Sequence, residues 1–71
     1  MKTGLQLTPS TKDAERVIHE AIANSDFYTE WNSEFGCYFF EEEPENYDEL
    51  EFQIDNLLAR STVNYRIEGI F

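Results

Sequence analysis

The residues of this chain that could act as a nucleophile and a base are a single cysteine, Cys37, and a single histidine, His19. A Cys-His pair can activate a thiolate for nucleophilic catalysis when the two side chains meet. Cys37 lies inside a predicted strand, with no basic cluster beside it in sequence to lower its pKa, and is interpreted as a small buried hydrophobe. His19 is interpreted as a surface residue one helical turn from Glu15. Catalysis by this pair is therefore not predicted.

Carboxylates are abundant, and pairs of them serve glycosidases and hard-metal sites when a water-excluding cleft fixes their separation. The acidic run at 41–45 lacks the alternate ligand spacing and the central glycine of a calcium loop. The three glycines lie too far apart for a phosphate-binding loop, and there is no zinc-protease motif. The sequence predicts no enzyme, no metal site and no cofactor.

The negative charge is concentrated in one part of the chain. The formal net charge is -10, and residues 26–55 contain eleven acids but no Lys or Arg. The remaining residues are close to neutral. Such a segment would repel DNA, RNA and anionic lipid, so we expect a basic protein partner, no direct contact with nucleic acid and no membrane.

The apolar pattern predicts the elements that must position these residues. Alternating apolar residues predict strands, and apolar residues spaced by three and four predict helices. Thr11 or Ser10 is expected to cap the first helix and Pro44 to begin the second. In chain order we predict a strand at 4–8, a helix ending near 24, strands at 27–32 and 35–42, a helix from 44 to about 60, and a strand from 62 onward.

This order is βαββαβ, the plan of ferredoxin-like α+β domains, in which a four-stranded antiparallel sheet carries both helices on one face. A chain of 71 residues is expected to form one domain, 1–71, with a small core that either a homodimer or the binding of a partner would stabilise. A single cysteine and the lack of a long apolar run lead us to expect a cytoplasmic protein.

The register of the predicted hairpin decides which of its aromatic rings reach the open face of the sheet. One register places the even-numbered residues of both strands there, and the other places the odd-numbered ones. Either way some rings lie on the surface, as is typical of a contact with another macromolecule. The candidate anchors, drawn from both registers, are Tyr28, Trp31, Tyr38 and Phe40.

The segment 34–40 resembles the central signature of RNA-recognition domains, which share this order of strands and helices. Phe35, Gly36 and Phe40 match it in register. The basic lead residue is absent, Cys37 stands where an aromatic residue is expected, and neighbouring acids would meet phosphates. We interpret the resemblance as one of architecture only.

The acids of the second predicted helix recur every ~5 to 6 Å along its exposed side, a spacing similar to that of a phosphate row. In size, charge pattern and aromatic content over 26–55, the chain resembles a class of small acidic proteins. Phages and other mobile elements use these proteins to block host nucleases, and the class includes anti-CRISPR and anti-restriction proteins that mimic nucleic acid. The acids expected to contact the partner are Glu41, Glu42, Glu43, Glu45, Asp48, Glu49 and Asp55.

This resemblance implies an inhibitor that occupies the basic nucleic-acid-binding surface of a host defence nuclease complex. One alternative is a solvated acidic face without a partner. Another is a non-catalytic ferredoxin-like regulatory or assembly module that dimerises through its sheet. A third is an enzyme, which would require a cleft that brings His19, Cys37 or a pair of acids together. Binding to a basic partner and the oligomeric state of the isolated protein discriminate among these hypotheses.

Overall fold

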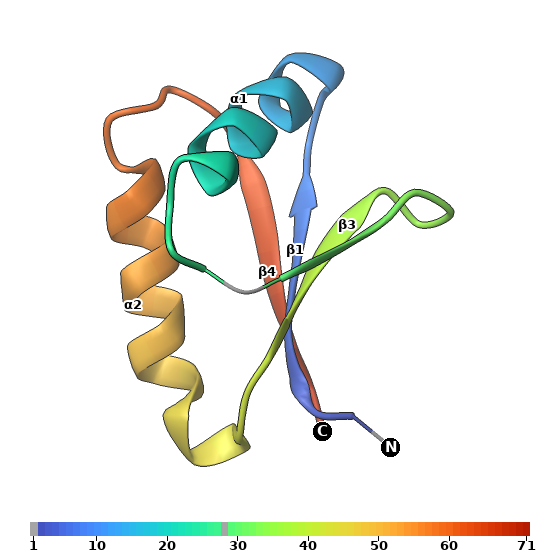
Figure 1. The fold of residues 1–71 in the computed structure, drawn as a ribbon, viewed down its shortest axis with the longest axis vertical. Helices are drawn as coiled ribbons and strands as arrows, with labels where there is room; N and C mark the ends of the chain where they lie inside the picture. Colours follow the sequence, from blue (N-terminus) through green and yellow to red (C-terminus); the bar gives the residue numbers. More distant parts are fainter. Residues whose placement is uncertain (1, 28) are drawn as a thin grey trace.

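The computed structural model describes residues 2–27 and 29–71 (Figure 1). It confirms an α+β protein with two helices and a four-stranded antiparallel sheet. The second predicted helix begins as a short 3-10 turn, and the strands of the hairpin are shorter than predicted. The elements are β1 (Gly4–Pro9), α1 (Lys12–Ala23), β2 (Glu30–Asn32), β3 (Cys37–Glu41), the 3-10 turn η1 (Pro44–Asn46), α2 (Tyr47–Leu58) and β4 (Tyr65–Ile70).

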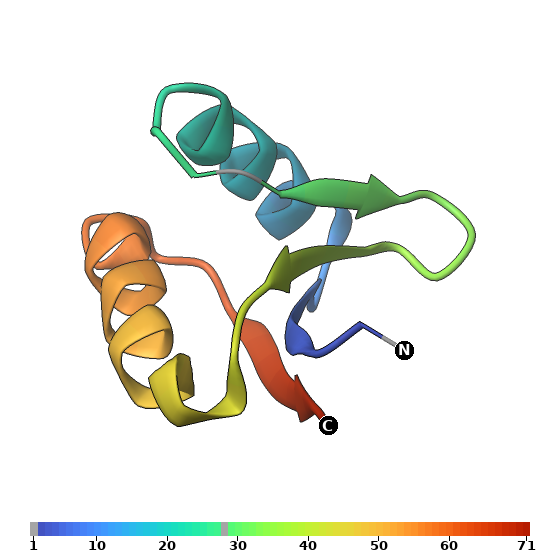
Figure 2. The same ribbon diagram turned by 60° about the horizontal axis from the view of Figure 1, so that its bottom comes forward.

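The strands of the sheet lie in the order β2-β3-β1-β4, and every neighbouring pair is antiparallel. β1 is therefore a central strand, hydrogen-bonded to β3 on one side and to β4 on the other. β2 and β4 form the two edges. The hairpin of β2 and β3 extends away from the helices at the turn that joins its strands (Figure 2).

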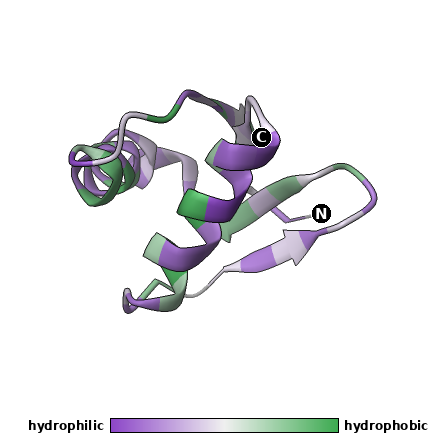
Figure 3. Cartoon of the chain, turned by 90° about the horizontal axis from the view of Figure 1, so that it is seen from above, coloured by the Kyte–Doolittle hydropathy of each residue, from purple (hydrophilic) through white to green (hydrophobic). Residues whose placement is uncertain are grey.

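The first helix begins where the sequence predicts. Thr11 is its N-cap, and the Thr11 side chain accepts a hydrogen bond of 3.0 Å from the amide of Ala14. Ala14, Ile18 and Ile22 form its buried stripe, and hydrophilic and hydrophobic residues alternate along it (Figure 3). The helix thus has one face for the core and one for solvent.

The core lies between the two helices and one face of the sheet. Leu5 and Leu7 of β1 alternate with residues on the other face, and they pack with the buried residues of both helices. Phe40, Leu7, Ile18 and Ile54 are its largest fully buried side chains. Since one core holds residues of α1, α2 and β1, both helices cover the same face, and the other face is open.

The turn between β2 and β3 contains four residues, 33–36. Its last residue, Gly36, has a φ of 65°, a conformation that glycine adopts without the steric cost a side chain would bring. The Asn32 side chain accepts hydrogen bonds from the amides of Glu34 and Phe35. This turn fixes the register, in which Trp31 pairs with Tyr38 and Asn32 with Cys37.

Both predicted registers of the hairpin are therefore wrong. Each prediction assumed that the residues of both strands that lie on one face are either all even-numbered or all odd-numbered. A four-residue turn instead pairs an even-numbered residue with an odd-numbered one, as in Glu30 with Phe39. Tyr38 and Phe40 consequently face the helices together with Trp31, while Glu30 and Phe39 lie on the open face.

Candidate functional site

The acids predicted to contact a partner follow one another along the end of β3, η1 and α2. All of them are exposed except Glu42, which is half-buried. Six of the seven lie on the chain from 42 to 55, and Glu51 lies among them. We call this set the acidic surface: Glu42, Glu43, Glu45, Asp48, Glu49, Glu51 and Asp55.

The seventh predicted acid, Glu41, points in a different direction. It follows Phe40 in β3 and pairs with Gly4. Because successive strand residues point to opposite faces, Glu41 lies on the open face of the sheet, whereas Phe40 faces the helices. The structure therefore does not group Glu41 with the acids of α2.

The acids of α2 lie on two flanks of the helix, three on one and Glu49 on the other. At about 100° of rotation per residue, Asp48, Glu51 and Asp55 follow one another along one flank of the helix. Glu49 lies on the other flank, where it lines a hollow of about 210 Å³ together with Glu42 and Gln53. The Glu42 carboxylate also accepts hydrogen bonds from the Glu43 amide and from Asn46. The continuous single row that the sequence predicts is therefore divided in two.

No acid of the acidic surface forms an ion pair with a described Lys or Arg side chain. The ion pairs of the described residues lie elsewhere: two within α1, one within β4, and one between Lys2 and Glu30 at 3.8 Å. The like charges of the acidic surface therefore repel one another without compensation from neighbouring cations. Their field extends into solvent, where a cationic partner would experience it.

An exposed phenylalanine, Phe52, lies between the two acidic flanks of α2. Phe52 is 65% exposed, one turn of helix from Asp48 and Glu49 on one side and from Asp55 on the other. A large apolar side chain surrounded by polar groups is the usual anatomy of an interface hot spot. Sequence reasoning missed Phe52, although its position off the Leu50–Ile54 stripe indicated that it faces outward.

Two of the predicted aromatic anchors are buried, which corrects the expectation that they lie on the surface. Tyr38 is 6% exposed and Phe40 is 2% exposed, and both belong to the core. Trp31 is half-buried and packs against the same core. Tyr28 lies outside the described residues. The physical reason is the register of the hairpin, which turns these rings toward the helices.

His19 is not the free surface residue that the sequence predicts. Its ring lies against the edge of Trp31, with centroids 4.4 Å apart, and its Nδ1 atom contacts the hydroxyl of Tyr38. Burial raises the pKa of Tyr38, and the nearby negative charge of Glu15 raises it further. Cys37 takes no part in this cluster, because it points to the other face of the sheet. The His19 and Cys37 side chains are therefore separated by the sheet.

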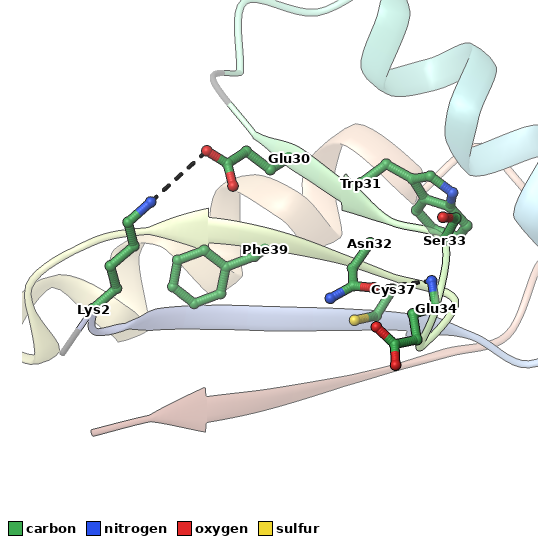
Figure 4. A pocket seen from close by; sticks show the side chains of 8 residues that line it. All are labelled: Lys2, Glu30, Trp31, Asn32, Ser33, Glu34, Cys37 and Phe39. Atoms are coloured by element: carbon green, nitrogen blue, oxygen red, sulfur yellow. Dashed lines mark hydrogen bonds and ion pairs between the residues drawn. The ribbon is translucent and has the colours of Figure 1, made fainter.

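Cys37 lies at the floor of a shallow hollow on the open face (Figure 4). The hollow has a volume of about 530 Å³ and is also lined by Lys2, Glu30, Asn32 and Phe39. Burial raises the pKa of the Cys37 thiol, which disfavours the reactive thiolate. Within 2–27 and 29–71, no group of three or more His, Cys, Asp or Glu side chains could hold a metal ion.

A hydrogen bond links the acidic surface to the start of β4. The Tyr65 hydroxyl donates to Oδ1 of Asp55 at 2.7 Å. Burial, this hydrogen bond, and the negative charges of Asp55 and Glu51 raise the pKa of Tyr65 to about 12. Burial and the acids of α2 together favour the neutral form of the phenol.

We expect the free energy of unfolding to fall as the pH rises from about 10 to about 12. A tyrosine in the unfolded chain ionises near pH ~10, so the folded pKa of Tyr65 lies above the unfolded one, and its contribution is complete only below pH ~10. Urea unfolding across this pH range should show a smaller fall for Tyr65→Phe. An unchanged pH dependence in that variant would contradict the assignment.

No described helix is both long enough and apolar enough to cross a membrane. The chain was compared with models of protein families, with curated proteins and with solved structures, and none of the three comparisons gave a match.

Proposed function

We propose that this protein is a non-catalytic inhibitor that occupies the basic nucleic-acid-binding surface of a host defence nuclease complex, in the manner of anti-CRISPR and anti-restriction proteins. In this proposal it is encoded by a phage or another mobile element, and it acts in the cytoplasm of the host cell. The acidic surface takes the place of a nucleic-acid backbone, and Phe52 anchors the contact.

For the fold, we propose the ferredoxin-like arrangement. The support is the strand order β2-β3-β1-β4 with antiparallel neighbours, together with two helices that share one core with a single sheet face. In this arrangement the second helix has a free outer side. That side carries Phe52 and the acids around it.

The observation that carries the proposed function is the set of carboxylates around Phe52 that form no ion pair with a Lys or Arg of the described residues. A channel that binds nucleic acid is lined with Lys and Arg, which neutralise phosphates spaced a few ångströms apart. Carboxylates on both flanks of α2, some of them one helical turn apart, present negative charge on either side of Phe52. The open face offers no comparable site, because it carries both signs of charge, with Lys2 beside Glu30 and Arg66 beside Glu68.

The test is inhibition of a panel of purified nucleases, comprising RNA-guided effector complexes and restriction endonucleases. Each is mixed with fluorescent duplex DNA that carries its target site. We expect the protein to displace the DNA from at least one of them and to prevent cleavage. The displacement should weaken as salt is added, because screening reduces attraction between opposite charges.

The triple variant Glu43→Gln, Asp48→Asn, Glu49→Gln removes three charges from the acidic surface. We expect the association rate with the inhibited nuclease to fall about tenfold or more at low salt, with a smaller change in the dissociation rate. Stopped-flow fluorescence measures both rates.

The matched control, Asp13→Asn, Glu20→Gln, Glu34→Gln, removes the same number of charges from positions outside the acidic surface. If both triple variants associate equally slowly, net charge rather than the acidic surface is responsible. If no nuclease in the panel releases DNA, the proposed function is wrong.

A further inference from the structure

The edge strand β4 lacks most of the features that usually prevent an edge from pairing with another chain. Its six residues contain no Lys and no Pro, their only charges are the opposite ones of Arg66 and Glu68, and the pairing with β1 runs without a bulge from Tyr65 to Ile70. In Figure 4 no other strand accompanies its outer side. The opposite edge, β2, has only three residues, against six in β4. β4 is therefore the better template for an added strand.

The hydrogen bonds of the sheet determine which backbone groups of β4 are free. The amide of Ser10 donates to the carbonyl of Asn64 at 3.1 Å, two residues along the ladder from the pair Thr8 and Arg66. In an antiparallel ladder, hydrogen-bonded pairs alternate with pairs that are not bonded. The backbone groups of residues 64, 66, 68 and 70 therefore face β1. Those of residues 65, 67 and 69 face outward.

We propose that β4 pairs with β4 of a second copy of this chain, antiparallel, with Ile67 opposite Ile67 on a twofold axis. In this register Tyr65 of each copy is opposite Gly69 of the other, so the outward-facing amides and carbonyls of both strands bond to one another. The two sheets join into one continuous sheet. The paired backbone groups belong to β4 alone, although Asp55 of the acidic surface is bonded to Tyr65 beside them. The inference does not rest on the proposed function.

Charge selects this register over its neighbours. Arg66 and Glu68 lie two residues apart on the open face, where they form an ion pair of 2.9 Å within β4. With Ile67 on the axis, Arg66 of each copy is directly opposite Glu68 of the other, in a pair of the closely spaced type. A twofold axis at Arg66 would place the two copies of Arg66 opposite one another, and one at Glu68 would do the same for Glu68. An axis at Tyr65 would place Arg66 opposite Asn64, and one at Gly69 would place Glu68 opposite Ile70. Only the Ile67 register pairs opposite charges twice.

The other face of the new ladder is apolar. Ile67 is half-buried in the isolated chain and gains a second Ile67 as its neighbour. Phe71 is 76% exposed, and its ring, 5.1 Å from that of Tyr47, lies over Gly69. Tyr65 of the second copy arrives beside Gly69 and so covers Phe71. The central neighbour, β1, contains no charged residue. The acids of α2 that lie near this edge are Asp55, which accepts a hydrogen bond from Tyr65, and Glu51.

Reversal of each charge tests the register. Arg66→Glu places like charges opposite one another twice in a homodimer, and so does Glu68→Arg. We expect each variant alone to lower the dimer association constant about tenfold or more. Sedimentation equilibrium of the full chain gives these constants, and circular dichroism checks that both variants are folded.

A mixture of the two variants supplies the matched control. In the heterodimer, the two acids of the Arg66→Glu chain lie opposite the two arginines of the Glu68→Arg chain, so both pairs of opposite charges across the interface are restored. Neither chain retains the ion pair between its own residues 66 and 68. We expect native mass spectrometry to show the heterodimer in excess over both homodimers. A protein that stays monomeric at high concentration overturns the inference. So does a dimer that both single variants leave intact, or a mixture without preference for the heterodimer.

Discussion

Replacement of Ile54 by alanine is expected to unfold a large part of the protein at room temperature. Ile54 is 0% exposed and lies on α2 in the core that joins both helices to the sheet. Truncation of a buried isoleucine to alanine costs about 2 to 5 kcal/mol, because it removes apolar contacts and leaves a cavity. Cores of this size supply only about 3 to 5 kcal/mol of net stability. Urea unfolding followed by circular dichroism measures the loss.

The matched control is Phe52→Ala, two residues earlier on the same helix. Phe52 is 65% exposed, so its truncation should change the free energy of unfolding by only about 0.5 kcal/mol or less. Equal losses in the two variants would mean that α2 does not pack through Ile54. Loss of structure in Phe52→Ala alone would mean that its ring is buried in solution.

Helices and strands could be predicted from the sequence because their signals are local. The buried stripe of α1 and its Thr11 cap lie within one short segment, and the alternation of β4 is visible in six residues. The bounds were less accurate where the signal is not local. Residues 35 and 36 were predicted to belong to a strand, yet they form part of the turn, since Gly36 adopts a positive φ.

The register of the hairpin could not be predicted, because it depends on the length of this turn and on the core. A shift of one residue moves every side chain of a strand to the other face. The aromatic residues of the hairpin lie on both faces, so the sequence pattern favours neither register. The folded protein adopts neither predicted register: Tyr38 and Phe40 are buried beneath the helices together with Trp31, because four residues form the turn.

Of the candidate site, the sequence locates the acids of α2 but not the residue at their centre. Acids that are closely spaced along a helix share its outer side, which is why their proximity follows from spacing alone. Glu41 is not part of this group, because it lies in a strand, where successive side chains point to opposite faces. Phe52 is harder to predict as an interface residue, because the aromatic residues of the hairpin are more prominent in the sequence. Several of those hairpin rings are in fact buried in the core.

The acids clustered on α2 lower the stability of the folded protein, and the fold does not require them. Exposed carboxylates on α2 repel one another, and no described Lys or Arg lies close enough to pair with them. A small domain with a limited core gains nothing in stability from this repulsion. A cationic partner would relieve it, so binding and stability are coupled through the same side chains.

Phe52→Ala is also expected to weaken binding to the inhibited nuclease by about thirtyfold or more, the loss typical of a large anchor residue at the centre of an interface. The reason differs from that for the acids. Carboxylates act at a distance and mainly accelerate association, whereas a buried ring holds the complex together and mainly slows dissociation. Stopped-flow competition with fluorescent DNA should therefore show faster dissociation with little change in association.

Phe35→Ala is the control for this prediction. Phe35 is 71% exposed, yet it belongs to the turn of the hairpin, which lies on the opposite side of the molecule from α2 (Figure 1). Its truncation removes a similar exposed ring without touching the acidic surface. If Phe35→Ala and Phe52→Ala dissociate equally fast, the outer side of α2 is not the contact. If Phe52→Ala instead slows association alone, the ring acts through the local charge arrangement and not as an anchor.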